Sequence, residues 1–336
     1  MQTLNIGING FGRIGRTLFR LLQGHPTIQV KAINDLADAR TLAYLLKYDS
    51  IHGTFQGEID NTESSIVVEG NSTALTHQEH PEHIDWRSHR VDLVVEATGK
   101  FKTRKSLEYH LQNGAQKVIL SVPPAEESIK MIVYGVNEDQ LTKKDHIISN
   151  ASCTTNNAAP MIKVLNDHWG VERAYITTVH SFTSDQSLHD SPHHNLRRAR
   201  AAGQSIIPTT TGAAKALTKI FPELANVIGG CGIRVPVPNC SLSDITLNLK
   251  KETSIQEIND IFEKVSENEL KNVLFYTKDP IVSIDINNSC YSCTFDSQMT
   301  SVLGKMVKVI GWYDNETGYS SRIIDVIQLL QRKNYI

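Results

Sequence analysis

The glycine-rich segment from Gly10 to Gly15 limits the fold of this chain more than any other feature. It reads Gly-Phe-Gly-Arg-Ile-Gly and fits the pattern G-x-G-x-x-G. Alternating apolar residues precede it over residues 4–8, and apolar residues at helical spacing follow it over residues 18–22. A glycine-rich turn between a strand and a helix is typical of a dinucleotide-binding unit, with the pyrophosphate at the helix N-terminus. The motif alone is weak, so the prediction depends on these flanking elements.

Each glycine of the motif has a separate expected role. Gly10 permits the tight turn, Gly12 lets the backbone approach the pyrophosphate, and Gly15 allows the helix to pack closely on the sheet. A second apolar run, residues 28–33, ends at Asp35. We expect Asp35 to bind the adenosine ribose hydroxyls and to repel a 2′-phosphate, which favours NAD over NADP. The alternative is that Asp35 caps the next helix.

The two halves of the chain differ in their apolar patterns. Short apolar runs at 91–97 and 117–121, separated by helical stretches, predict an α/β domain over residues 1–151 with a Rossmann-type, doubly wound parallel sheet. Longer runs of period two and an amphipathic helix over 259–265 predict a second, α+β domain over residues 152–316 with a mostly antiparallel sheet.

Composition excludes several classes of protein. The 336 residues suffice for two domains, and the net charge of -2 gives no electrostatic reason to expect nucleic acid or an anionic membrane as the main partner. No apolar run is long enough for a membrane-spanning helix, and the N-terminus passes straight into a strand pattern instead of a signal peptide. Five cysteines, an odd number, favour free thiols and a cytoplasmic location.

Cys153 is the candidate nucleophile. It follows the apolar pair at 147–148 and lies among small hydroxyl and amide residues, so we expect it where a strand meets a helix. Backbone N–H groups at such a place lower the pKa of a thiol and hold a developing oxyanion. His180, at the end of a later strand, is the candidate general base. Taken singly, each also fits a structural role, as a buried cysteine and a strand-end histidine.

The long segment from Ser181 to Gly212 is polar, rich in His and Arg, and too long for a simple connection. Its arginines and its Thr-Gly turn suit phosphate recognition. The same arginines also fit a solvated turn or a subunit contact. Its histidines lack carboxylate or cysteine partners at metal-ligand spacing, and the CxxC of Cys290 and Cys293 fits chance spacing on a strand, so we expect no metal.

Ten sequence blocks together resemble phosphorylating glyceraldehyde-3-phosphate dehydrogenase, and the resemblance covers nearly the whole chain. The blocks, in the order of that family, are INGFGRIGR (8–16), INDLAD (33–38), LLKYDSIHG (45–53), EATGKF (96–101), SNASCTTN (149–156), TTVHSFTSDQ (177–186), LRRARAA (196–202), PTTTGAAKA (208–216), RVPVPN (234–239) and WYDNETGYS (312–320). The resemblance implies an NAD-binding domain that the C-terminal helix, 317–336, rejoins, and a catalytic domain over 152–316. It also implies a homotetramer in which the Ser181–Gly212 segment lines a subunit interface.

The resemblance also implies roles for individual residues. By matching position, Cys153 is the nucleophile and His180 is its base. The residues implied for the substrate phosphate are Thr183 and Arg234, with Asp185 nearby, and those for the attacking inorganic phosphate are Ser152, Thr154, Arg198, Thr211 and Gly212. The residues implied for NAD, besides the three glycines, are Arg13, Ile14, Asp35, Thr98, Ser121, Asn315 and Tyr319.

The implied reaction oxidises D-glyceraldehyde 3-phosphate to 1,3-bisphosphoglycerate, in glycolysis or gluconeogenesis, through a thiohemiacetal and a thioester on Cys153. The alternatives are erythrose-4-phosphate dehydrogenase, in which water is the acyl acceptor, and a non-catalytic NAD-binding interaction protein. The intact PTTTGAAKA block argues against the first, and the presence of thiol, base and arginine argues against the second.

Three positions depart from the family pattern. Asn157 replaces a frequent second cysteine, so an intrachain Cys153 disulfide at that spacing is impossible. Ser191 replaces a leucine, which removes an apolar contact near the adenosine ribose and weakens the expected preference for NAD. Glu79 replaces an arginine near the adenine.

Overall fold

The computed structural model describes residues 3–336, which divide into two compact units. The first contains the chain up to residue 132, residues 139–151 and Ser320–Ile336, and the second contains Val133–Glu138 and Ser152–Tyr319. The second unit therefore includes a short excursion of the chain before residue 152, and the division near the C-terminus lies within the last helix rather than before it.

The first unit has a mostly parallel sheet. Over the described residues its nine strands have the order β3-β4-β5-β2-β1-β6-β7-β9-β8, and only the β3-β4 and β4-β5 pairs are antiparallel. Its elements are β1 (Leu4–Asn9), α1 (Arg13–Leu21), β2 (Ile28–Asn34), α2 (Ala39–Lys47), β3 (Ile59–Thr62), β4 (Ser65–Val68), β5 (Asn71–Thr76), β6 (Leu93–Glu96), α3 (Arg104–Gln112), β7 (Lys117–Leu120), β8 (Lys130–Met131) and β9 (Ile147–Ser149).

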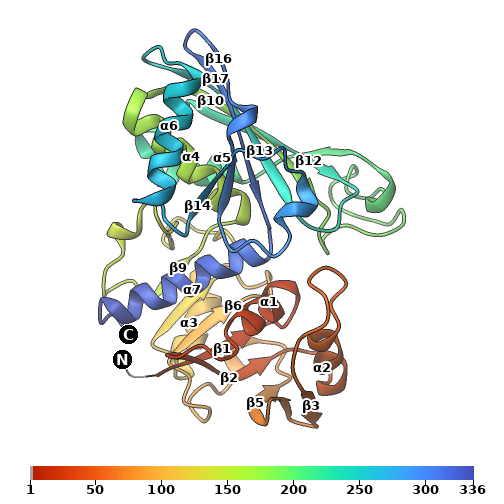
Figure 1. Cartoon of the computed structure of the whole chain (residues 1–336). Coiled ribbons are helices and arrows are strands. Elements are labelled where there is room, and N and C mark those ends of the chain that lie inside the picture. The colour runs from red at the N-terminus through yellow and green to blue at the C-terminus, as the bar shows by residue number, and fades with distance from the viewer. Residues whose placement is uncertain (1–2) are drawn as a thin grey trace. The chain divides into compact units, whose positions relative to one another are not determined.

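The last helix, α7 (Thr317–Arg332), belongs to the first unit from Ser320 onward (Figure 1). The amide of Gln328 lies 3.0 Å from His25, and Gln331 donates to the carbonyl of Thr27, so the helix is tied to the segment that leads into β2. Its apolar residues Ile323, Ile327 and Leu330 are fully buried.

The second unit has a mostly antiparallel sheet. Its eight strands within the described residues run β11-β12-β10-β13-β17-β15-β14, with β16 paired to β17, and only β10-β12 and β14-β15 are parallel. Its elements are α4 (Cys153–Trp169), β10 (Val171–Ser181), β11 (Ile207–Thr209), α5 (Ala213–Ile220), β12 (Ile228–Val235), β13 (Ser241–Leu249), α6 (Ile255–Glu267), β14 (Leu274–Thr277), β15 (Cys293–Asp296), β16 (Ser301–Leu303) and β17 (Met306–Tyr313).

The helices of the second unit lie on one face of its sheet (Figure 1). Along β10, Ile176, Thr178 and His180 are buried, whereas Tyr175, on the opposite face, is 53% exposed. This alternation places His180 on the face that the helices cover. The two sheets confirm the predicted fold class.

Candidate active site

Cys153 is the first residue of α4, as the sequence predicts. Strand β9 ends at Ser149, and Ala151 in the connecting turn has a φ of 56°, in the left-handed region that a non-glycine residue rarely adopts. Ser152 caps the helix, because its hydroxyl accepts a 3.2 Å hydrogen bond from the N–H of Thr155. The thiol therefore lies at a helix N-terminus, where backbone N–H groups are available to an anion.

His180 lies beside this thiol. Its Nε2 is 3.5 Å from Sγ of Cys153, and its Nδ1 is 2.7 Å from the carbonyl oxygen of Ser181. Nδ1 thus faces a backbone carbonyl oxygen, and Nε2 faces the thiol. The pair thus has the geometry of a nucleophile and its general base.

Arg234 completes this group of side chains. The parallel register of β10 and β12 places it directly opposite His180. Its Nη1 donates to the carbonyl oxygen of Ser181 at 2.8 Å and also lies 2.8 Å from Nδ1 of His180. Sheet register therefore fixes the cation next to the base.

The electrostatics of the pair differ from the expectation. Burial raises the pKa of the Cys153 thiol, although Arg234 and the backbone and side chain of Thr154 act to lower it. Burial, together with the charges of Arg234 and Arg198, lowers the pKa of His180 to about 3. The prediction that the helix N-terminus gives a lowered thiol pKa is wrong for this structure, because desolvation of the thiolate outweighs the N–H groups. Burial thus disfavours both charged forms of the pair, the thiolate of Cys153 and the imidazolium of His180.

Tyr313 is a member of the site that sequence reasoning missed. Its hydroxyl lies 2.8 Å from Oγ1 of Thr154 and 3.1 Å from Oγ1 of Thr178, and its ring packs edge-on to His180. Thr154 is therefore buried, with its hydroxyl bound to this tyrosine. The signal available in the sequence was its place in the block WYDNETGYS.

Asn157, at the position of the missing second cysteine, is fully buried in α4. Its Nδ2 donates to the carbonyl oxygens of Ser292 and Trp312, both at 3.3 Å. The amide thus ties the catalytic helix to the sheet behind it. The five cysteines, Cys153 included, are free thiols.

The Ser181–Gly212 segment contains several of the other residues that the sequence analysis predicts to bind phosphate. Arg198 donates to Oγ1 of Thr209 at 3.0 Å and to the carboxylate of Asp185 at 2.6 Å, so Asp185 contacts an arginine. The structure adds the short strand β11 to this segment, which the sequence analysis treated as a loop.

Three further members of this set lie at the ends of the same segment. The carbonyl of Thr183 accepts from the N–H of Gln186 in a local turn. Thr211 accepts from the N–H of Ala213 where α5 begins, and a side chain on Gly212 would enter open space.

The glycine motif of the first unit forms one wall of a cavity of about 230 Å³. Gly10 has a φ of 94°, and a Cβ on Gly15 would lie 2.2 Å from the carbonyl oxygen of Gly10. A Cβ on Gly12 would meet no atom within 4 Å. The turn therefore needs glycine at Gly10 and Gly15 for conformation and packing, and leaves the backbone at Gly12 and the N-terminus of α1 open to a ligand.

Asp35 and Thr98 line the same cavity, and so do Asn9, Asn34 and Glu79, of which the sequence analysis had considered only Glu79. The carboxylate of Asp35 accepts from the N–H of Phe11 at 2.7 Å. Asp38, and not Asp35, caps helix α2. A glycine-lined hollow with a carboxylate at the end of β2 fits an adenine dinucleotide.

The other residues predicted to contact the cofactor are more scattered. Arg13 forms an ion pair with Asp49, and Ser121 donates its N–H to the carbonyl of Glu96. Ile14 lies in the first turn of α1. Asn315 and Tyr319 belong to the second unit, where Oδ1 of Asn315 accepts from the hydroxyls of Ser181 and Ser241.

Among residues 3–336, no group of three or more His, Cys, Asp or Glu side chains is placed to hold a metal ion. In the same range, no helix has the length and apolar character needed to cross a membrane.

Comparison with known proteins gives a consistent result. Residues 4–104 match the family described as glyceraldehyde 3-phosphate dehydrogenase, NAD binding domain, and residues 152–315 match glyceraldehyde 3-phosphate dehydrogenase, C-terminal domain. The chain is 49% identical over 334 residues to glyceraldehyde-3-phosphate dehydrogenase of Geobacillus stearothermophilus, with 99% of each chain covered. It is 47% identical over 334 residues to glyceraldehyde-3-phosphate dehydrogenase 1 of Bacillus subtilis, again with 99% of each covered.

A third relative agrees. The glyceraldehyde-3-phosphate dehydrogenase of Streptomyces coelicolor is 48% identical over 329 residues, which cover 97% of this chain and 98% of the relative. These matches confirm the resemblance, the NAD-binding domain and the type of enzyme that the sequence blocks predict. The chain belongs to the glyceraldehyde-3-phosphate dehydrogenase family.

Proposed function

We propose that the chain oxidises D-glyceraldehyde 3-phosphate to 1,3-bisphosphoglycerate with NAD and inorganic phosphate, through a covalent intermediate on Cys153. The observation that carries this proposal is the 3.5 Å approach of Nε2 of His180 to Sγ of Cys153 at the N-terminus of α4. The shared activity of the relatives supports it.

Cys153 and His180 divide the chemistry between them. As the thiol attacks the aldehyde carbon, Nε2 of His180 takes the thiol proton and returns it to the former carbonyl oxygen, and the product is a thiohemiacetal. NAD, when bound, supplies the acceptor for the hydride that this carbon loses. His180 accepts the hydroxyl proton in that step, which leaves a thioester. Inorganic phosphate then attacks the thioester carbonyl, the C–S bond breaks, and the acyl phosphate leaves while Cys153 is restored.

A neutral His180 suits this role. Its pKa of about 3 leaves the imidazole unprotonated near neutral pH, so that its lone pair is available whenever substrate arrives. The positive charge of Arg234 favours the thiolate as it forms. The N–H groups at the start of α4 stabilise the oxyanion of the adduct.

The phosphate groups are assigned to the cations of the second unit. Arg234, with Thr183, would hold the substrate phosphate, and Arg198, with Ser152, Thr211 and Gly212, would hold the attacking phosphate. The ion pair of Asp185 with Arg198 supports a role for Asp185 in orienting that arginine. The contact of Thr154 with Tyr313 supports a role in positioning the start of α4.

The residues of the first unit would hold NAD. The open backbone at Gly12 and the first N–H groups of α1, at Arg13 and Ile14, suit the pyrophosphate. Asp35 suits the ribose hydroxyls, and the exposed carboxylate of Glu79 in the same cavity adds a second negative charge against a 2′-phosphate.

The remaining cofactor contacts follow the resemblance. Thr98 and Ser121 would flank the dinucleotide, and Tyr319 would pack near the nicotinamide. Because two hydroxyls already occupy Oδ1 of Asn315, its Nδ2 is the group left to orient the carboxamide.

A homotetramer and a cytoplasmic location complete the proposal. The Ser181–Gly212 segment exposes Leu188, Leu196 and Ile206, which are 74%, 82% and 71% exposed. Apolar side chains of this size on one long segment support its burial against another subunit. The free thiols support a reducing compartment.

The test is phosphate dependence. NADH formation from glyceraldehyde 3-phosphate should require phosphate or arsenate, because water is a poor substitute as acyl acceptor in a site built around arginines. Equal rates without either anion would contradict the proposal and favour an enzyme that hydrolyses its thioester.

A further inference from the structure

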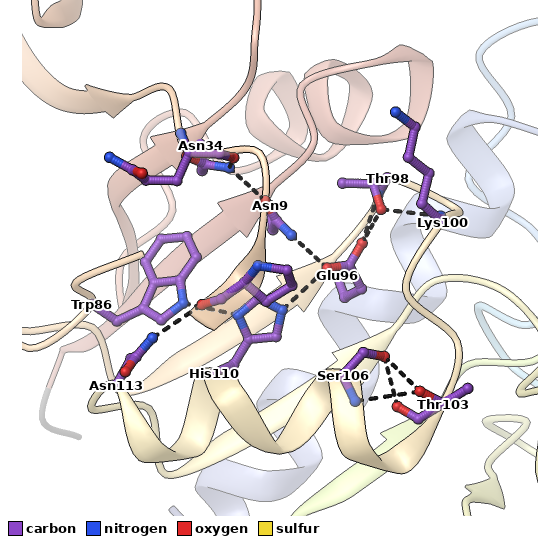
Figure 2. A network of polar contacts seen from close by, with 12 residues as sticks. Asn9, Asn34, Trp86, Glu96, Thr98, Lys100, Thr103, Ser106, His110 and Asn113 are labelled. Atoms are coloured by element: carbon purple, nitrogen blue, oxygen red, sulfur yellow. Dashed lines mark hydrogen bonds and ion pairs between the residues drawn. The ribbon is translucent and has the colours of Figure 1, made fainter. Parts of the chain in front are cut away.

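A network of buried polar side chains extends from the lining of the cofactor cavity into the first unit, and Figure 2 shows its members. It runs from Asn34 at the end of β2, through Asn9 at the end of β1 and Glu96 at the end of β6, to His110 on α3 and Trp86. These five residues are 4%, 1%, 0%, 0% and 0% exposed. None of the proposed catalytic steps uses Glu96, His110 or Trp86.

Glu96 is the centre of this network. Its Oε2 lies 2.5 Å from Nδ2 of Asn9 and 3.1 Å from Nε2 of His110. Its Oε1 accepts from the N–H of Thr98 at 2.9 Å and from the hydroxyl of Thr98 at 2.5 Å. Every contact comes from a donor, so the four contacts fill the acceptor positions of the carboxylate. A buried anion is tolerated only with such complete hydrogen bonding.

Trp86 fixes which nitrogen of His110 faces Glu96 (Figure 2). The indole Nε1–H donates to Nδ1 of His110 at 2.9 Å, and an indole only donates. Nδ1 is therefore the acceptor, and Nε2 carries the proton that points to Glu96. The indole itself cannot shift easily, because it packs on β1 so closely that a Cβ on Gly7 would lie 2.7 Å from its ring.

Part of the network forms the wall of the cavity. Asn9, Asn34 and Thr98 line the cavity, whereas Glu96, His110 and Trp86 do not. Oδ1 of Asn9 accepts a 2.8 Å hydrogen bond from Nδ2 of Asn34. The turn at Gly10 packs on the same wall, since a Cβ there would lie 2.7 Å from the backbone nitrogen of Thr98.

We propose that Glu96 is a positioning residue for the dinucleotide cavity, with its carboxylate held in place by His110 and Trp86. By binding both Asn9 and Thr98, it joins the ends of β1 and β6 and fixes the position of the glycine turn against Thr98 before the ligand arrives. Binding then costs less ordering of the site. This inference rests on the proposed function, which places the dinucleotide in this cavity.

Glu96→Gln is the direct test, because it keeps the shape of the side chain and replaces one acceptor oxygen by a donor. That NH2 group then opposes either the donors of Asn9 and His110 or those of Thr98. His110 cannot reverse its tautomer while Trp86 donates to Nδ1. We expect the Kd for NAD, measured by calorimetry without substrate, to rise about tenfold.

Glu108→Gln is the matched control. Glu108 lies on the same helix as His110, its side chain is 45% exposed, and its ion pair with Arg104 is 4.0 Å long. The Glu108→Gln variant loses the same charge as Glu96→Gln but leaves the Glu96 network unchanged. Its Kd for NAD should therefore equal that of the wild type.

Kinetics separate positioning from a general loss of structure. In Glu96→Gln we expect the KM for NAD to rise about as much as the Kd. The kcat at saturating NAD, and the alkylation rate of Cys153 without NAD, should stay unchanged. A lower melting temperature with an unchanged Kd in the folded variant would overturn the proposal and leave Glu96 a purely structural residue.

A second variant keeps the test valid if Glu96→Gln fails to fold. His110→Phe removes one donor to Glu96 at a position outside the cavity, and a rise in Kd of about threefold is expected. An unchanged Kd would again overturn the proposal. If the wild type itself bound no NAD, the proposed function would fail; if the wild type and Glu96→Gln bound it equally, only this inference would fail.

Discussion

The two units prepare their sites in different ways. In the first, the ligand surface is mainly backbone, open at Gly12, and its shape depends on glycines and a buried carboxylate network. In the second, the reactive atoms belong to side chains from three segments, Cys153, His180 and Arg234, which helix packing and strand register bring together. The first unit should therefore be most sensitive to substitutions that change its backbone geometry. The second should be most sensitive to substitutions that change the chemistry of a side chain.

The largest effect is expected from His180→Asn. The variant keeps a polar side chain but loses the general base, so kcat should fall by a factor of about 10² to 10⁴. Circular dichroism and NAD calorimetry should match the wild type, because none of the residues assigned to NAD is changed. Retention of more than a tenth of the kcat would contradict the role of His180.

Gly15→Ala tests the first unit in the same way. Its Cβ would lie 2.2 Å from the carbonyl oxygen of Gly10, a backbone atom that cannot move without opening the turn. We expect a loss of about 1–3 kcal/mol in the free energy of unfolding, measured by urea denaturation, and weaker NAD binding. Gly203→Ala is the control, since a Cβ there meets open space, and it should change stability by less than about 0.5 kcal/mol. Equal behaviour of the two variants would argue against close packing at Gly15.

Arg234→Gln tests the electrostatics of the second unit. Burial raises the pKa of Cys153 and the charge of Arg234 opposes that rise, so removal of the charge should move the pKa further up. The pH profile of iodoacetamide alkylation should shift to higher pH than in the wild type. Arg197→Gln, at an exposed position in the same unit, should leave the profile in place. A shift to lower pH in Arg234→Gln would contradict the account.

The smallest effect is expected from Asp49→Asn in the first unit. Burial alone would raise the pKa of Asp49, but hydrogen bonds from Arg13 and from the N–H groups of His52 and Ile51 hold it below its ordinary value of 3.8. The folded pKa is thus lower than the unfolded one, so the carboxylate stabilises the fold above about pH 4 and this contribution is lost as the pH falls. Near neutral pH we expect Asp49→Asn to lose about 1 kcal/mol, and this deficit should shrink in acid. Asp60→Asn, at an exposed position, should show no such pH-dependent deficit.

The sequence predicted the elements of the first unit well, because its motif is local. The Gly10–Gly15 turn, the strand before it and Asp35 after it lie close together in the chain, and each has a characteristic residue pattern. The lining residues Asn9 and Asn34 went unnoticed, because an asparagine at a strand end has no distinctive pattern. Glu96 looked like an ordinary strand residue, and only the fold shows it buried among four donors.

The second unit was harder to predict from residues alone. Cys153 and His180 were candidates, but the approach of their side chains depends on how α4 packs on β10, and no local pattern encodes that. The predicted direction of the Cys153 pKa shift was wrong, because burial of the thiol sets this shift and burial also depends on how the elements pack. Tyr313 ends strand β17, whereas Cys153 begins helix α4 and His180 lies on β10.

The most direct test of covalent catalysis is intact-protein mass spectrometry of the enzyme mixed with glyceraldehyde 3-phosphate and NAD without phosphate. We expect one acyl adduct per chain, mapped to Cys153 by digestion at low pH, absent from Cys153→Ser and discharged when phosphate is added. An enzyme that forms NADH at the full rate with no adduct, or with the adduct on another residue, would contradict the account.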